Sequence, residues 1–240
     1  MSQPERFRTE PRDHRFFSVA AIAVAALVVF GFAQTYPHAL RGGTSLPPIV
    51  HLHAAVFVAW LALFIVQTRL VARGRVDLHR RLGTWGIALA ALMLLLGVGT
   101  AIAVARLGHR GIPGVEFPDP SGFLLLNLAS IVVFAALVGF GWRMRHDAQA
   151  HKRLMSLATL GALAPPGIAR LPLLAGKTPA IAVAALSLLL LGPLYDLATR
   201  KRVHRAYLWG LLAMLATLPP IVGAIASTDI WRRVAEWLVA

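Results

Sequence analysis

The chain has 240 residues, of which 58% are hydrophobic and 14% charged, with a formal net charge of +14. This composition excludes a soluble globular protein, and the grouping of the basic residues between long apolar runs excludes a nucleic-acid-binding face. Because there is no cysteine, disulfides, thiolate metal sites, iron–sulfur clusters and covalent c-type haem are excluded, and a cofactor would depend on histidine, carboxylate or methionine.

Seven apolar segments are long enough to cross about 30 Å of hydrocarbon. They are continuously apolar instead of alternating, which favours helices over the strands of a membrane barrel. The sequence therefore predicts an all-α fold, a polytopic transmembrane helical bundle that forms one membrane domain over 1–240 and has the lipid bilayer as its partner. The expected helices cover residues 16–35, 48–71, 82–105, 121–142, 154–175, 179–198 and 206–226.

The two ends of the chain are expected to lie outside the bundle. Residues 1–15 predict a cytoplasmic tail, and the apolar run that follows is longer than a usual signal-peptide core, so it is expected to remain as an anchor. The stretch DIWRRVAEWLVA at 229–240 has apolar residues at helical spacing and charged residues on the other side. It predicts a short helix that lies in the outer membrane interface.

Lysine and arginine are distributed unequally among the connections. Seventeen of the 24 fall in the N-terminal tail and in the connections after the second, fourth and sixth expected helices. Positively charged loops stay on the cytoplasmic side. The sequence therefore predicts a multi-pass protein of the bacterial inner membrane with its N-terminus inside and its C-terminus outside.

Proline and glycine mark the irregular segments. The pairs Pro165–Pro166 and Pro219–Pro220 fall in the outer halves of the expected fifth and seventh helices. Proline removes a backbone donor, so each pair is expected to kink its helix. The segment 106–120 is rich in both residue types and is expected to form an external loop.

Three related stretches, VDLHRRLGTWG, AQAHKRLMSLA and KRVHRAYLWGL, begin the third, fifth and seventh expected helices. They place His79, His151 and His204 at equivalent inner positions. Neutral imidazoles from several helices at one depth can bind haem iron or a divalent metal, or carry protons. The alternative is that they are basic anchors at the membrane surface.

Asp196 lies about one turn inside the apolar boundary of the sixth expected helix. A lone carboxylate is costly there and needs an arginine or histidine partner. The candidate partners are His79, Arg80, Arg153 and His204. Asp196 is expected either to act as a buried strut or to take part in proton movement.

A second polar layer lies near the opposite face. His51 and His53 stand two positions apart in the first turns of the second expected helix, so they face about 200° away from each other and only one can point into the bundle. Arg170 and Tyr36 are expected at a similar depth. Arg170 is a candidate for holding an anionic group such as a haem propionate or a lipid phosphate, or it reaches outward to the headgroups.

Two histidine layers separated by about 24 Å of helix are what a transmembrane two-haem electron carrier would need. This gives the first functional hypothesis, a redox protein with haem b or a metal. Its cofactor-binding candidates are His51, His53, His79, His151, His204 and Arg170. The alternatives are a proton-coupled carrier that uses Asp196, and a structural or assembly protein without a ligand.

Familiar enzyme motifs are absent. The sequence contains no Gly-x-Ser-x-Gly, no Walker loop and no His-Glu-x-x-His. It therefore does not predict the usual hydrolase or nucleotide sites, and no residue is assigned a catalytic role.

The segments HLHAAVFVAWLALFIVQTRLVARGRVDLHRRLG, AHKRLMSLA and LYDLATRKRVH together resemble an uncharacterised family of bacterial multi-pass membrane proteins. The similarity spans most of the chain, with GIAR here in place of the family's AIAR. The resemblance implies a membrane location and a multi-pass topology, and it implies no activity. The family-like positions are Tyr36, His51, His53, Gln67, Arg75, His79, His151, Arg153, Arg170, Asp196 and His204.

Overall fold

The structure is a computed structural model, in which the described residues are 10–41, 46–112 and 114–240. Within these ranges the side chains of 36–41 are not described. Most of the expected tail at 1–15 and the side chain of Tyr36 therefore lie outside the described part of the chain.

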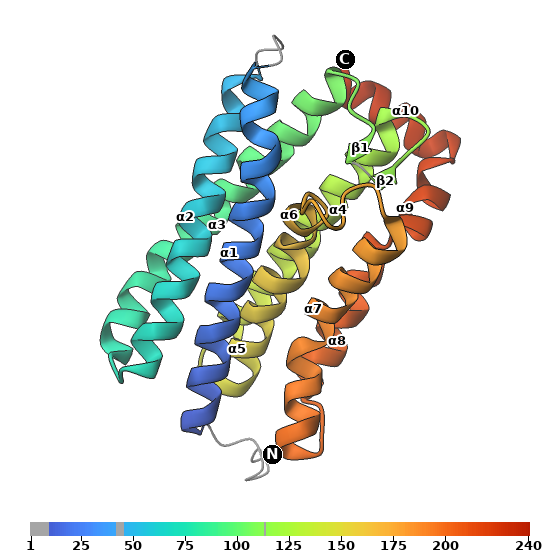
Figure 1. Cartoon of the computed structure of the whole chain (residues 1–240). Helices are drawn as coiled ribbons and strands as arrows, with labels where there is room; N and C mark the ends of the chain where they lie inside the picture. The colour runs from blue at the N-terminus through green and yellow to red at the C-terminus, as the bar shows by residue number, and fades with distance from the viewer. Residues whose placement is uncertain (1–9, 42–45, 113) are drawn as a thin grey trace.

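The described chain is a bundle of helices that run roughly side by side (Figure 1). Five of them are long and apolar enough to cross a membrane, and in α1 the qualifying part is Pro11–Thr35. They are α1 (Pro11–Arg41), α2 (Pro48–Ala72), α3 (Val76–Arg106), α4 (Pro120–Arg143) and α7 (Thr178–Arg200). The prediction of a helical membrane protein is confirmed.

The last expected crossing is a bent pair. A helix, α8 (Arg205–Met214), continues through a 3-10 turn and is followed by α9 (Pro219–Ala226). Together the two parts are long and apolar enough to cross a membrane, and they meet at an angle of 45°. The expected kink at the second proline pair is therefore confirmed, since α9 begins at Pro219.

The expected fifth helix over 154–175 is wrong in its outer part. The chain forms α5 (Ala148–Ser156), a π-helix (Leu157–Leu163) and the single turn α6 (Pro165–Ile168), and residues 169–177 form turns and bends. Pro165 and Pro166 have no N–H, so the preceding carbonyls lose their usual partners and the helix cannot continue unchanged.

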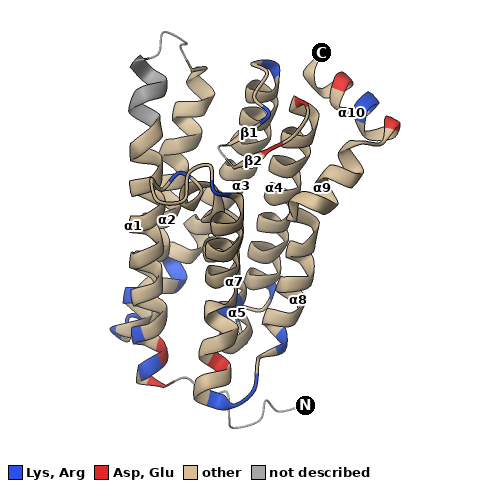
Figure 2. Ribbon diagram, turned by 45° about the vertical axis from the view of Figure 1, so that its right-hand side comes forward, with Lys and Arg blue, Asp and Glu red and all other residues tan. Residues whose placement is uncertain are grey.

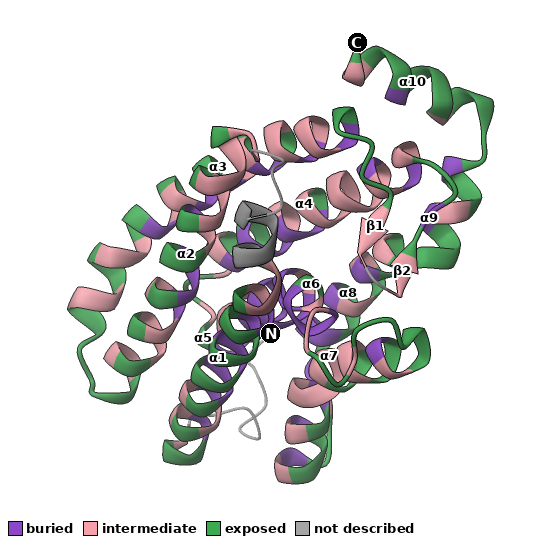
Figure 3. Ribbon diagram, turned by 45° about the horizontal axis from the view of Figure 1, so that its top comes forward, coloured by how far each residue is buried: buried purple, intermediate pink, exposed green. Residues whose placement is uncertain are grey.

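The π-helix lies at the centre of the bundle. All but one of its residues are buried, and Figure 3 shows buried positions gathered where α5 and α6 run between the other helices. The indole N–H of Trp60 on α2 donates to the hydroxyl of Thr159 at 3.2 Å. Two hydrophobic clusters meet here, one toward α4 and α8 and one toward α1.

α1 and α6 approach each other backbone to backbone. A Cβ atom on Gly31 would lie 1.9 Å from the carbonyl oxygen of Gly167, and one on Gly167 would lie 2.8 Å from the Cα of Val28. Neither position has room for a larger side chain. Small residues allow this kind of approach between membrane helices.

The connection between α3 and α4 contains a short hairpin, where a loop was expected over 106–120. Its strands, β1 (Gly111–Ile112) and β2 (Val115–Glu116), pair antiparallel. The hydroxyl of Thr178 donates to the Gly114 carbonyl at 2.7 Å. The final helix, α10 (Asp229–Val239), agrees with the helix expected at 229–240.

Charged residues gather at the two ends of the bundle (Figure 2). We call the end that holds the start of α1 and the end of α7 the basal end, and the opposite end, which holds α10, the distal end. The basal end carries most of the lysines and arginines.

Candidate functional site

Asp13 is the centre of a buried set of charges at the basal end. It lies in the first turn of α1 and is 1% exposed. One guanidinium nitrogen of Arg200 donates to both of its oxygens at 2.7 and 2.6 Å. Its carboxylate also accepts from the Lys152 ammonium at 2.6 Å and from the Tyr195 hydroxyl at 2.8 Å.

Asp196 is the second buried carboxylate of this set. Arg153 donates to it through Nε at 2.8 Å and through a terminal nitrogen at 2.5 Å, the two-pronged geometry that favours arginine. Asp196 also accepts from the His204 backbone N–H at 3.2 Å. The third guanidinium nitrogen of Arg153 donates to the carbonyl and the side-chain oxygen of Gln149.

The two carboxylates are linked, because Arg200 also lies 3.5 Å from Asp196. We call these residues the basal ion network; its members are Asp13, Gln149, Lys152, Arg153, Tyr195, Asp196 and Arg200. The network joins α1, α5 and α7 and contacts the start of α8. Buried charges are tolerated when they are paired and hydrogen-bonded in this way.

The burial of Asp196 was expected, and one of its four candidate partners, Arg153, is confirmed. Sequence reasoning missed Asp13, which was assigned to the tail. The signal was present, since Pro11 and Asp13 are residues that favour the first turn of a helix. They extend α1 beyond its apolar run.

Two of the three inner histidines lie together. The rings of His79 on α3 and His151 on α5 have centroids 6.0 Å apart and planes inclined at 82°. Nδ1 of His151 is 2.8 Å from the Gly141 carbonyl oxygen, so that nitrogen carries the proton and Nε2 has the lone pair. Nδ1 of His79 is buried and has no hydrogen-bond partner among the described residues.

His204 has a different position, at the N-cap of α8. Its Nδ1 accepts the backbone N–H of Ala206 at 3.2 Å. Burial lowers the pKa of His204 to about 4, and the nearby Arg153 guanidinium acts in the same direction. The ring is therefore neutral near pH 7, as an acceptor at Nδ1 requires.

The histidine and carboxylate side chains at the basal end limit which metal ions could bind there. Among the described residues there is no group of three or more histidine, cysteine or carboxylate side chains that would hold a metal ion. The pair of His79 and His151 offers two imidazoles only. A bare divalent ion needs more protein ligands than this.

The distal histidines lie on the first turns of α2. His53 is half-buried, its ring centroid is 4.9 Å from that of Phe57, and in the described part of the chain its Nδ1 has no hydrogen-bond partner. His51 is also half-buried. Whether either ring binds a cofactor stays a prediction.

Arg170 follows α6 and packs against α1. Its guanidinium lies 4.5 Å from the ring centre of Phe32 and donates to the Pro166 carbonyl at 2.7 Å. Cation–π contact and a helix-end carbonyl account for its place in the fold. A role in holding an anion stays a prediction.

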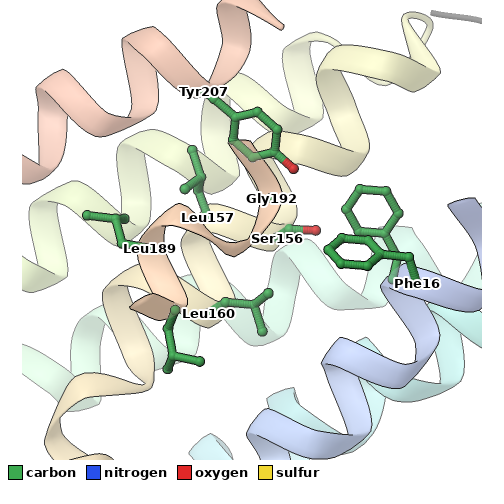
Figure 4. A pocket seen from close by; sticks show the side chains of 9 residues that line it. Phe16, Ser156, Leu157, Leu160, Leu189, Gly192 and Tyr207 are labelled. Atoms are coloured by element: carbon green, nitrogen blue, oxygen red, sulfur yellow. The ribbon is translucent and has the colours of Figure 1, made fainter. Parts of the chain in front are cut away.

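A small cavity lies between α1, the end of α5, the π-helix, α7 and α8 (Figure 4). Its volume is about 10 Å³, and its lining includes Phe16, Ser156, Gly192 and Tyr207. The Tyr207 hydroxyl is buried, has no hydrogen-bond partner within the ranges that the structure describes, and points toward Phe16. This volume is on the scale of one water molecule, so the cavity cannot hold a cofactor.

No family model, curated protein or solved structure matches this chain. The resemblance to bacterial multi-pass proteins therefore stays a prediction.

Proposed function

We propose that this protein is an electron-transfer protein of the membrane that binds a b-type haem between His79 and His151. The observation that carries the proposal is the spacing of the two imidazole rings, 6.0 Å between centroids. Both residues belong to the inner histidine layer expected from the sequence. We propose a single haem, at the basal end of the bundle.

The spacing supports two ligands on opposite sides of one metal ion. Such imidazoles have ring centroids about 6 Å apart, because each metal–nitrogen bond is about 2 Å long and each ring nitrogen lies about 1 Å from its ring centre. The contact between His151 and the Gly141 carbonyl supports the same role. A ligating histidine usually donates its other ring nitrogen to a carbonyl or carboxylate.

Haem suits this pair better than a bare metal ion. A porphyrin supplies four equatorial nitrogens itself and leaves two axial positions for the protein. Two histidines and no cysteine fit a b-type haem, which is not attached covalently. When bound, the iron would supply reversible one-electron chemistry, and His79 and His151 would hold it.

The test is an absorption spectrum of the protein purified after expression with ample haem. We expect a Soret band and, on reduction, the sharp visible bands of a haem with two imidazole ligands. His79→Ala and His151→Ala should each remove these bands. His146→Ala is the matched control, because His146 is exposed five residues before His151 and should leave the spectrum unchanged.

Colourless wild-type protein, or haem that remains with two histidine ligands in both variants, would contradict the proposal. His204→Ala distinguishes the pair from the N-cap histidine. It should reduce the stability of the fold while the spectrum of the remaining folded protein keeps its bands.

We also propose how the helices of this protein cross the membrane and which end faces the cytoplasm. We infer seven crossings in the bacterial inner membrane, with the basal end cytoplasmic and the C-terminus outside. The fifth crossing would run through α5, the π-helix and α6. The concentration of lysine and arginine at the basal end supports this orientation.

The basal ion network favours a structural role for Asp196 over proton transport. Asp196 accepts from Arg153, Arg200 and the His204 backbone N–H, and Asp13 accepts from three side chains. Both carboxylates thus have their oxygens occupied by donors from the neighbouring helices. We therefore treat the network as a support for α5, the helix that carries His151.

A further inference from the structure

A second cavity lies at the distal end, far along the bundle from the paired histidines. It has a volume of about 350 Å³, is open on one side, and is bordered by α10 and by the adjoining ends of α3 and α4. Cavities that bind small ligands begin at about 300 Å³. This cavity is therefore large enough for a ligand group, unlike the cavity beside Tyr207.

α10 is fastened over this cavity at both ends. Near its start, the indole N–H of Trp231 donates to the Ser121 carbonyl at 3.0 Å. At its end, the carbonyl of Val239 accepts from Nε of Arg106 at 2.9 Å. Between them Ala235 is buried against α3 and α4. Two hydrogen bonds and one buried contact thus fix the position of α10 over the cavity.

One face of α10 presents exposed apolar side chains. Ile230 and Trp237 are 79% and 77% exposed and stand on one face of the helix with Val234. An amphipathic helix with such a face lies at the boundary between headgroups and acyl chains. The cavity beneath it is therefore at the depth of lipid headgroups.

The lining of the cavity combines charges of both signs with apolar side chains. The charged groups are Asp119, Arg232 and Glu236, and Leu124 and Val239 add apolar surface. Hydrogen bonds from Ser121 hold the pKa of Asp119 below its usual value, so this carboxylate is ionised near pH 7. The lining therefore presents two anionic groups and one cationic group.

We propose that this cavity binds the headgroup of a zwitterionic phospholipid with a primary ammonium, of the phosphatidylethanolamine type. The ammonium faces Asp119 and Glu236, the phosphate faces Arg232, and the glycerol region meets Leu124. A purely anionic headgroup satisfies Arg232 but meets two carboxylates. The proposal is independent of haem binding and concerns the opposite end of the molecule.

The experiment is native mass spectrometry of the full chain, released from detergent micelles that contain equal amounts of phosphatidylethanolamine and phosphatidylglycerol. We expect one retained lipid per chain and a preference of about fivefold for phosphatidylethanolamine, the size of one partly exposed charge interaction. Glu236→Gln should reduce that preference to near one. Arg233→Gln is the matched control, since Arg233 is a neighbouring exposed arginine outside the lining.

Two competition experiments distinguish a lipid-headgroup site from a simple phosphate site. Soluble glycerophosphoethanolamine should compete with the lipid, and inorganic phosphate should not. Displacement by inorganic phosphate would reveal a simple anion site. Equal retention of the two lipids by the wild type, or an unchanged preference in a Glu236→Gln variant with a normal unfolding midpoint, would overturn the proposal.

Discussion

At the scale of single residues, Arg153 shows how the chain keeps charges inside an apolar bundle. It is fully buried and its donors reach Asp196 and Gln149. Removing two charges from water costs several kcal/mol for each ion, and only good geometry with additional hydrogen bonds offsets this cost. The pair is therefore sensitive to the loss of one partner and tolerant of the loss of both.

We predict that Asp196→Asn destabilises the fold by about 3–5 kcal/mol, because it leaves the Arg153 charge without its main partner. The double variant Arg153→Met with Asp196→Leu should recover most of this loss. Unfolding in mixed micelles, followed by circular dichroism, measures both. Asp77→Asn is the control, because Asp77 is exposed and 3.7 Å from Arg75, and it should change stability by less than about 1 kcal/mol.

If the single and double variants were equally unstable, the network would not act as a paired unit.

The sequence was informative at Asp196, because a carboxylate inside an apolar run needs a cation. It was less informative at Asp13, since the same residue before an apolar run fits a solvated tail equally well. His79 pairs with His151, and not with His204, because of how α3 and α5 pack against each other. The periodicity of the sequence carries no information about this packing.

At the scale of secondary structure, the contact between α1 and α6 depends on two glycines. Gly31 and Gly167 place the backbones so close that a Cβ on either meets main-chain atoms. Backbone cannot move aside as a flexible side chain can, so a larger residue has to separate the helices. This contact fixes the short α6 turn that follows the π-helix.

We predict that Gly167→Ala destabilises the fold by about 1–3 kcal/mol through overpacking. Gly139→Ala is the control within α4, because a Cβ there meets nothing within 4 Å. It should stabilise the protein by about 0.5–1 kcal/mol through helix propensity. Unfolding midpoints of both variants test the prediction, and equal effects of the two substitutions would contradict it.

The long helices were predictable because their apolar runs exceed the thickness of the bilayer. The expected α2 begins at the observed residue and ends one residue early, and the expected α4 is one residue short at each end. The fifth segment was not predictable in the same way. Its composition stays apolar past Ile168, while Pro165, Pro166 and Pro172 decide the backbone. Hydropathy alone cannot report a π-helix or a chain that turns back.

At the scale of the whole molecule, the number of crossings decides on which side each end lies. With an odd number of crossings, α10 and the basal end lie on opposite sides of the membrane. The segment through α5, the π-helix and α6 is therefore decisive, since it is not among the long apolar helices. The arginine-rich connections before α3, α5 and α8 provide the physical reason for the proposed orientation.

We predict that Arg233→Cys is labelled by a membrane-impermeant maleimide on intact spheroplasts, and that Arg145→Cys is labelled only after permeabilisation. The chain has no native cysteine, so each variant carries one thiol, and both positions are exposed. Accessibility of both thiols from the same side would mean an even number of crossings between them. The proposed topology would then be wrong.

The salt bridge between Asp13 and Arg200 joins positions 187 residues apart. Chains emerge from the ribosome N-terminus first, so Asp13 is synthesised long before Arg200, and Lys152 is the earlier of its two cationic partners. Until then α2 is the neighbour available to α1. The full set of contacts around Asp13 therefore forms late in synthesis, and a nascent chain that stops short of Arg200 would lack this bridge and be a ready target for quality-control proteases.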